Sequence, residues 1–168
     1  MNKIGVFYGS TTGTTEDVAR RIAEKLNVPS AHIFEVSKLT EDLVNEYDVL
    51  VLGSSTWGAG ELQDDWYDGV NVLKKCDLSH KYVALFGCGD SDSYSDTFCD
   101  AIGIIYEDLK DTHCKFCGAV DTAGYTFDSS IAVVDGKFVG LPIDEVNEDN
   151  QTEERISAWA EQVKQEIS

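Results

Sequence analysis

The hydrophobic positions of this chain fall into short apolar runs that alternate with stretches of helical spacing. Most of the runs are continuously apolar, which is typical of strands that helices cover on both faces. We therefore predict five strands, at Lys3–Tyr8, Ala31–Glu35, Val49–Gly53, Tyr82–Cys88 and Phe116–Val120. After the first run, apolar residues recur at Val18, Ile22 and Leu26, and this spacing predicts an amphipathic helix. Further helices are expected over Gln63–Leu73, Ala101–Asp111 and Glu153–Ile167.

The alternation of strands and helices predicts an α/β fold. We expect a doubly wound, five-stranded parallel sheet in the order 2-1-3-4-5, with helices on both faces. The 168 residues contain no repeat, proline-rich linker or low-complexity segment, so a single domain over residues 1–168 is expected. Such folds bind ligands beyond the carboxyl ends of their strands, where we expect the loops Gly9–Thr15, Ser54–Gln63 and Gly89–Phe98.

The first of these loops is rich in hydroxyl groups and leads directly into the first helix. Hydroxyls and free backbone N–H groups at a helix start form an anion site. A triphosphate-binding loop would need a lysine, and a dinucleotide fingerprint would need three suitably spaced glycines; neither occurs here. The loop therefore favours one terminal phosphate, and an elaborate helix cap is the alternative. Its candidate ligand residues are Ser10, Thr11, Thr12, Gly13, Thr14 and Thr15.

The other two loops each carry an aromatic residue, Trp57 and Tyr94. Two such rings can sandwich a flat aromatic ligand whose phosphate tail lies in the hydroxyl loop. Flavin mononucleotide (FMN) matches this outline. Glycines in both loops would let the backbone approach the ring edge. The candidate cofactor residues of these two loops are Ser54, Ser55, Thr56, Trp57, Gly58, Ala59, Gly60, Cys88, Gly89, Asp90, Tyr94, Phe98 and Cys99.

The chain is strongly acidic, with 31 acidic against 13 basic residues and a net charge of -18. This balance argues against nucleic acid or an anionic membrane as partner and favours basic proteins. No Lys or Arg occurs between Thr56 and Val72 or between Tyr82 and Leu109. The carboxylates of these stretches are expected to lower the second reduction potential of a flavin by on the order of 100 mV or more. A solvated face that only aids solubility is the plainer interpretation.

Features that indicate a cell compartment point to the cytoplasm. No segment approaches the roughly 20 apolar residues of a membrane span, and the start lacks the apolar core of a signal peptide. Five cysteines at irregular spacing suit reduced thiols. Cys114, Cys117 and His113 lack the further ligands that zinc needs. A cytoplasmic monomer without a metal is expected.

Several longer stretches carry a family resemblance. GSTTGTTE, TWGAGELQDDW, FGCGD and AGYTF…VVDGKFVGLPIDEVN follow one another across nearly the whole chain. Together they resemble the phosphate loop, the two flavin-flanking loops and the inserted segment of long-chain flavodoxins. The resemblance implies non-covalent FMN, with Ser10–Thr15 on its phosphate and the two aromatic loops on its ring. It also implies that residues 126–147 interrupt the fifth strand with a small extra sheet.

The expected function is low-potential electron transfer on FMN, mainly between its semiquinone and hydroquinone. In the family, the peptide after the tryptophan turns over on reduction, and Gly58 would lower the cost of that turn. No general base, nucleophile or metal ligand set accompanies the flavin loops, so we expect a carrier rather than an enzyme. An FMN-dependent quinone or NAD(P)H reductase and a binding protein without flavin are the alternatives. Expected partners are basic-surfaced redox proteins such as a ferredoxin/flavodoxin reductase or a 2-oxoacid oxidoreductase.

Overall fold

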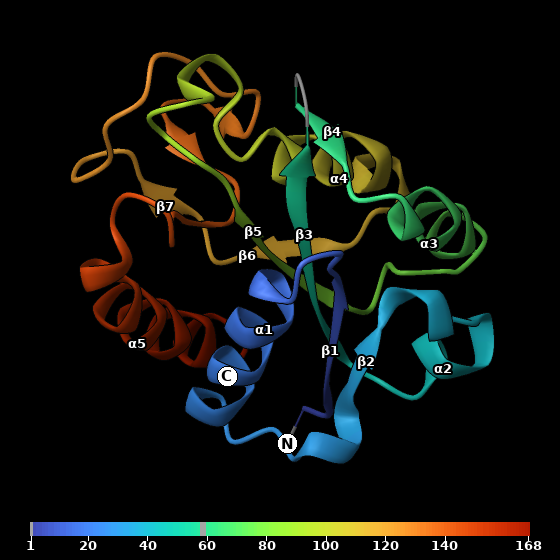
Figure 1. Cartoon of the computed structure of the whole chain (residues 1–168). Coiled ribbons are helices and arrows are strands. Elements are labelled where there is room, and N and C mark those ends of the chain that lie inside the picture. Colours follow the sequence, from blue (N-terminus) through green and yellow to red (C-terminus); the bar gives the residue numbers. More distant parts are fainter. Residues whose placement is uncertain (1, 58–59) are drawn as a thin grey trace.

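A parallel sheet forms the centre of the protein (Figure 1), seen in a computed structural model that describes residues 2–57 and 60–168. Its principal strands run in the order β2-β1-β3-β5-β10, which agrees with the predicted order 2-1-3-4-5. Their bounds are β1 (Ile4–Gly9), β2 (Ile33–Glu35), β3 (Val49–Trp57), β5 (Tyr82–Cys88) and β10 (Leu141–Ile143). All of these neighbours pair in parallel, so their carboxyl ends share one edge of the sheet. The short strand β4 (Glu61–Leu62) pairs antiparallel with the end of β3.

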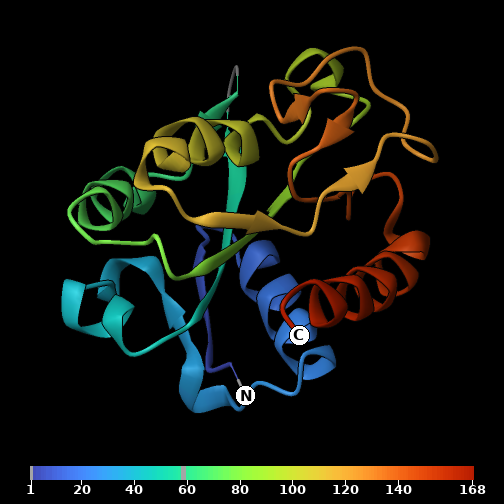
Figure 2. The ribbon, with the colours of Figure 1, turned by 180° about the vertical axis from the view of Figure 1, so that it is seen from behind.

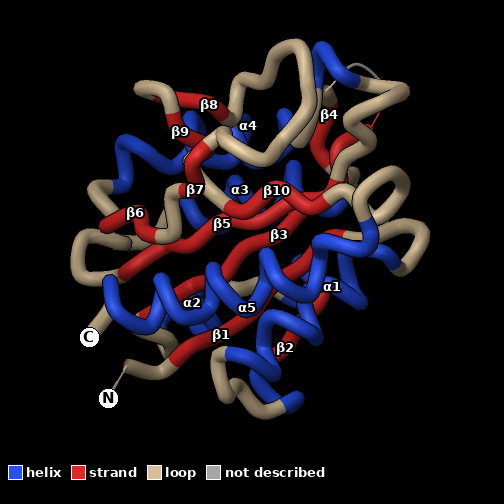
Figure 3. The backbone as a smooth tube through the Cα atoms, turned by 90° about the vertical axis from the view of Figure 1, so that its left-hand side faces the viewer, coloured by secondary structure: helices blue, strands red, loops and turns tan. Residues whose placement is uncertain are grey.

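Helices cover both faces of the sheet, as the sequence predicts (Figures 2 and 3). One face packs against α1 (Thr14–Lys25) and α5 (Asp149–Glu166). The other packs against α2 (Glu41–Asn45), α3 (Asp65–Lys74) and α4 (Asp100–Leu109). Short 3-10 turns are η1 (Ser30–His32), η2 (Val36–Lys38), η3 (Ser95–Thr97) and η4 (Lys110–Thr112). Across residues 2–57 and 60–168, no helix has the length and apolar character needed to cross a bilayer.

Burial on both faces of the sheet explains why the central strands are continuously apolar. In β3, Val49 and Val51 enter the core beneath α1 and α5, whereas Leu50 and Leu52 enter the core beneath α3 and α4. Successive side chains of a strand point to opposite faces, so a sheet buried on both sides needs apolar residues at every position.

The fifth strand differs from its predicted bounds. It consists of β6 (Lys115–Cys117) and β10, which pair with successive parts of β5. Residues 118–140 separate them and contain a small antiparallel sheet of β7 (Val120–Asp121), β9 (Lys137–Phe138) and β8 (Val133–Val134). The prediction of an interrupting small sheet is confirmed, but its predicted range of 126–147 is wrong at both ends.

Gly118 explains why the first half of this strand stops early. Its φ of 81° lies in the left-handed region, where the chain leaves the sheet. A Cβ at this position would lie 2.7 Å from Nε1 of Trp159, whose indole N–H donates to the Gly118 carbonyl at 2.8 Å. Buried Phe138 then packs against Phe98, Tyr125 and Phe127, so the inserted sheet has an aromatic core of its own.

Candidate functional site

A pocket of about 190 Å³ lies at the carboxyl edge of the sheet. The end of β3 and the segments at and after the ends of β1, β5 and β10 contribute to it, which brings parts of the three predicted loops together with a fourth segment. Its lining residues are Thr12, Thr14, Ser55, Thr56, Trp57, Cys88, Gly89, Asp90, Tyr94, Thr97, Cys99, Glu145 and Val146.

The hydroxyl loop leaves the start of α1 open. Gly13, with φ of 94°, precedes the helix, and within the described residues no side chain caps it. The Gly13 N–H donates to Ser10 Oγ at 3.0 Å, which closes the loop on itself. Thr15 Oγ1 is buried and makes no hydrogen bond of normal geometry in the described part of the chain, although it lies close enough to the Cys88 thiol to lower the pKa of that thiol against the larger effect of burial. Among the described residues no side-chain cap bond is found at the N-cap residue Gly13, which argues against the alternative of an elaborate helix cap.

The charges around this loop are negative or already paired. Glu16 and Asp17 lie in the first turn of α1, and each carboxylate lies near an arginine one turn later, Arg20 at 3.0 Å and Arg21 at 3.6 Å. An anion at this helix start would therefore be held by N–H groups, hydroxyls and the helix dipole rather than by a cation.

Hydrogen bonds to neighbouring residues hold the tryptophan side of the pocket in place. Trp57 ends β3, is 40% exposed and donates its indole N–H to Ser55 Oγ at 2.8 Å. Thr56 Oγ1 accepts the backbone N–H of Ala101 at 3.1 Å, which ties this side to the start of α4. Ser54 is buried and accepts the Gln63 N–H at 3.2 Å, so its hydroxyl serves the loop rather than the pocket.

Gly60, the first described residue after Trp57, lies close to α4. Gly58 and Ala59 lie outside the described residues. Gly60 has φ of 96°, and a Cβ there would lie 2.6 Å from Oδ2 of the buried Asp100. Burial raises the pKa of Asp100 above its ordinary value, although the N–H of Ile131 donates to its other oxygen at 3.0 Å.

The tyrosine side of the pocket is an irregular loop held together by hydrogen bonds to Asp90. Tyr94 is 52% exposed. Asp90 Oδ1 accepts the backbone N–H groups of Ser93 at 2.9 Å and Asp92 at 3.1 Å, and also the side-chain amide of Asn147 at 2.8 Å. The bond from Ser93, followed by that from Asn147, holds the pKa of Asp90 below its ordinary value despite partial burial. Phe98 is buried in the aromatic core of the inserted sheet and does not line the pocket.

Two buried thiols, Cys88 and Cys99, line the floor of the pocket. Burial raises the pKa of Cys88 to about 12 and that of Cys99 well above its ordinary value, so both stay protonated and weakly polar. A Cβ on Gly89 would lie 2.9 Å from Cys99 Sγ, so glycine lets the backbone and thiol pack closely. The floor suits the face or edge of an apolar ring.

The comparisons with known proteins agree with this geometry. A family model described as Flavodoxin matches residues 6–159. The chain belongs to the flavodoxin family. Flavodoxin 1 of Azotobacter vinelandii is 42% identical over 174 residues, covering 99% of this chain and 98% of the relative. The flavodoxin of Helicobacter pylori is 43% identical over 164 residues, covering 98% of each.

Solved flavodoxin structures share the fold over the same length. The crystal structure of Fusobacterium nucleatum flavodoxin bound to flavin mononucleotide has a TM-score of 0.89 and 29% identity, with 99% of each chain covered. Its K13G mutant bound to flavin mononucleotide has a TM-score of 0.91 and 30% identity, covering 99% of this chain and 97% of the other.

The predicted residues divide into a group that lines the pocket and a group that supports it. Ten of the candidates line it: Thr12, Thr14, Ser55, Thr56, Trp57, Cys88, Gly89, Asp90, Tyr94 and Cys99. Seven others lie beside or beneath it without lining it: Ser10, Thr11, Gly13, Thr15, Ser54, Gly60 and Phe98. The cofactor roles of both groups remain predictions.

Three lining residues, Thr97, Glu145 and Val146, were missed by the sequence reasoning. The last two follow β10, whose short apolar run Leu141–Ile143 lies inside the range assigned to the insertion. Recognising this run as the second half of the fifth strand would have placed them at the carboxyl edge.

Proposed function

We propose that this protein carries electrons between redox enzymes on non-covalently bound FMN. The observation that supports this most is the pairing of an open helix start with two exposed rings across one pocket. The relatives named above are flavodoxins, and one solved relative covering 99% of this chain binds flavin mononucleotide. As a member of this family of electron carriers, it passes electrons on without catalysing a reaction of its own.

The phosphate of FMN would bind at the start of α1. The N–H groups of Thr14 and Thr15 belong to the first turn, whose donors have no acceptor within the helix. The buried, unpartnered Thr15 hydroxyl adds a donor at the same place within the described structure. A phosphate supplies several strong acceptors, so it fits a site that has donors to spare.

The isoalloxazine ring of FMN would lie between Trp57 and Tyr94. Both rings are partly exposed, as expected for side chains that gain contacts only when a ligand enters. Ser55 holds the indole from below, and the loop around Asp90 holds the tyrosine side. When bound, FMN supplies the one-electron redox chemistry, and these residues bind, orient and shield its ring.

The finer proposal is that the cofactor works at low potential, mainly between semiquinone and hydroquinone. It is supported by the acidic residues of the two aromatic loops: among the described residues, none of the carboxylates Glu61, Asp64, Asp65, Asp68, Asp90, Asp92 and Asp96 forms an ion pair with Lys or Arg. Unpaired negative charge near a ring disfavours adding an electron to it. Gly58 lies outside the described residues, so its part in this proposal rests on the sequence alone.

The same acidic surface would orient basic-surfaced redox partners, such as a ferredoxin/flavodoxin reductase or a 2-oxoacid oxidoreductase. We place this exchange in the cytoplasm and assign it to the monomer. All five cysteines, each within the described residues, are free, which suits a reducing compartment.

The test is to remove any flavin from the purified protein and titrate the apoprotein with FMN. We expect one equivalent to bind with quenched flavin fluorescence. Riboflavin, which lacks the phosphate, should bind roughly 100-fold more weakly because charge-assisted hydrogen bonds are lost. During stepwise anaerobic reduction, the second one-electron potential should lie below that of free FMN.

A protein that takes up no FMN would overturn the proposal and support a flavin-free binding protein. Mixing the flavin-loaded protein with NADPH alone should leave it oxidised. Prompt bleaching would indicate a reductase instead.

A further inference from the structure

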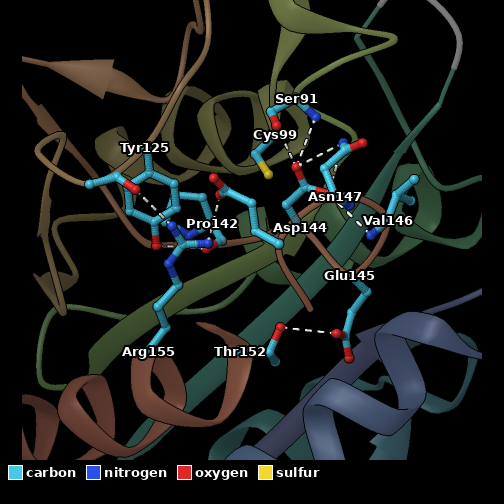
Figure 4. Close-up of polar contacts among 12 residues, drawn as sticks. Ser91, Cys99, Tyr125, Pro142, Asp144, Glu145, Val146, Asn147, Thr152 and Arg155 are labelled. Atoms are coloured by element: carbon cyan, nitrogen blue, oxygen red, sulfur yellow. Dashed lines mark hydrogen bonds and ion pairs between the residues drawn. The ribbon is translucent and has the colours of Figure 1, made fainter. Parts of the chain in front are cut away.

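Asp144 is a fully buried carboxylate directly after β10, beside the pocket but not in its lining. Figure 4 shows its oxygens pointing between Ser91 and Asn147. The backbone N–H and hydroxyl of Ser91 both donate to Oδ2, the N–H at 3.1 Å. The backbone N–H groups of Val146 and Asn147 donate to Oδ1 at 3.1 and 2.9 Å, and the Asn147 side-chain amide donates to Oδ2 at 3.0 Å.

These bonds keep Asp144 charged inside the protein. Burial by itself would raise its pKa, but the bonds from Ser91 and Asn147 outweigh burial and hold the pKa below the ordinary value. Within the described residues the Asp144 carboxylate has no Lys or Arg partner. The nearby Arg21 instead forms an ion pair with the neighbouring Glu145 at 3.0 Å. The charge is therefore stabilised by hydrogen-bond donors alone, and every donor belongs to one of two loops.

The network around Asp144 joins the two segments that form one wall of the pocket. The first runs from Cys88 to Thr97 and carries Tyr94; the second is 145–146. The Asn147 amide also donates to Asp90 at 2.8 Å, so one side chain bridges the carboxylates of both segments. The Gly89 N–H donates to the Ile143 carbonyl at 2.9 Å, where the two segments leave the sheet.

We propose that Asp144 is a positioning residue for the ring end of the pocket: its buried carboxylate fixes the Tyr94 loop against the segment that carries Glu145 and Val146. This inference rests on the proposed function for the identity of the ring. An ionised carboxylate is suited to this task because it only accepts hydrogen bonds, and all groups that face it are donors. An amide would turn an NH₂ group toward N–H donors and leave buried groups unpaired.

The test compares Asp144→Asn with Asp92→Asn in the full-length apoprotein. Asp92 lies on the same loop and is exposed, and in the described structure its carboxylate accepts no hydrogen bond, so its substitution controls for charge. FMN and riboflavin are each titrated by fluorescence. Asp144→Asn should weaken both ligands by the same factor, at least about tenfold, because the damage is at the ring end. Asp92→Asn should leave both within about twofold of the parent.

Amide hydrogen exchange of the apoprotein gives a second readout that needs no flavin. In Asp144→Asn, the N–H groups of Ser91, Val146 and Asn147 should lose more protection than the N–H groups of β1 and β3 do. A second variant, Asn147→Ala, changes an exposed residue. It removes the side-chain amide that bonds both Asp90 and Asp144 but keeps the backbone N–H bond from residue 147 to Asp144. It should weaken both ligands about threefold.

Two results would overturn the proposal. One is parental affinity for riboflavin in Asp144→Asn; the other is an equal loss of protection over the whole sheet, which would make Asp144 a residue of general stability. Failure of the parent protein to bind FMN would refute the proposed function instead. In that case hydrogen exchange alone decides whether Asp144 fixes the two loops.

Discussion

The polar groups at the two ends of the pocket differ in whether they already have hydrogen-bond partners within the protein. At the start of α1, within the described residues, the helix lacks a side-chain cap and the buried Thr15 hydroxyl lacks a partner. At the other end, Asp144 accepts hydrogen bonds from Ser91, Val146 and Asn147, so the polar groups of these loops are already paired with one another. A site for a charged phosphate must keep donors free, whereas a site for a flat ring needs rigid walls whose polar groups are already paired. This contrast yields predictions that separate the two ends.

The largest effect is expected from Thr15→Val, which replaces the buried hydroxyl with a methyl group of similar size. FMN affinity should fall roughly 10- to 100-fold because a bond to a charged phosphate is lost, whereas riboflavin affinity should not change. The apoprotein should at the same time become more stable by about 1 kcal/mol, because a buried unpaired group is removed. Fluorescence titration and urea unfolding measure the two quantities. Weaker riboflavin binding would show that Thr15 acts on the ring end instead.

At the ring end, Tyr94→Leu and Trp57→Leu should each weaken FMN and riboflavin by the same factor, about tenfold. Each loses offset stacking and part of the contact area, while the start of α1 is untouched. Both side chains are partly exposed, so the free energy of unfolding of the apoprotein should change little. Tyr67→Leu, at a similarly exposed tyrosine of α3 outside the pocket lining, is the matched control. A preferential loss of FMN affinity would contradict the division between the two ends.

The charge around the ring should tune the potential rather than the affinity for riboflavin. Replacing the exposed Asp64, Asp92 and Asp96 with Asn should raise the second one-electron potential by on the order of 50 mV in low salt. The control replaces the exposed Glu24, Asp42 and Glu46, which lie on or next to α1 and α2 away from the pocket lining. Spectroelectrochemistry compares the two triple variants. Equal potentials would show that the acidic loops do not tune the potential of the flavin.

The smallest effect concerns the second buried aspartate, Asp100, whose pKa burial raises, whereas hydrogen bonds outweigh burial and lower the pKa of Asp144. Because its folded-state pKa is raised above 3.8, ionisation costs stability as the pH rises through that raised pKa. Asp100→Asn keeps the acceptor for Ile131 and removes the charge, so it should slightly stabilise the protein at pH 7. The gain should vanish below pH 3.8, where both states are protonated.

The effect of Asp144→Asn on stability should have the opposite sign at pH 7 from that of Asp100→Asn. The folded-state pKa of Asp144 is lowered, so its stabilising effect is fully present above 3.8 and is lost as the pH falls through the lower folded-state pKa. The substitution should therefore destabilise at pH 7 and cost progressively less in acid. Urea unfolding at several pH values measures both variants, and the same sign for both at pH 7 would contradict this account.

Much of the fold follows from local sequence signals. The apolar runs and the spacing in α1 predict a parallel sheet with helices on both faces, because a doubly covered sheet requires those patterns. The observed strand order was expected because it is one of the two common orders of doubly wound sheets. The lining residues near the carboxyl ends of β1, β3 and β5 could be predicted because each strand has a recognisable apolar run. The third strand nevertheless continues beyond its predicted end at Gly53 to Trp57, so residues expected in the loop belong to the strand. The fifth strand could not be bounded in this way, since β6 and β10 have three residues each and depend on pairing with β5.

The residues that support the pocket could not be recognised from the sequence for a related reason. Asp144 reads as one more surface acid in a chain of 31, and only the tertiary structure buries it among donors from a loop about 50 residues earlier. Phe98 and Ser54 are typical of a flavin loop in sequence, yet the structure uses Phe98 in an aromatic core and the Ser54 hydroxyl in a hydrogen bond within its own loop. Local patterns thus locate the loops, but tertiary packing decides which side chains reach the pocket.

The central claim is that one end of this pocket holds a phosphate and the other a ring. The ratio of FMN affinity to riboflavin affinity, measured by titration in the parent, Thr15→Val and Tyr94→Leu, tests it most directly. The account predicts a ratio that falls at least about tenfold in Thr15→Val and stays at the parental value in Tyr94→Leu. A ratio that changes equally in both variants, or in neither, would contradict it.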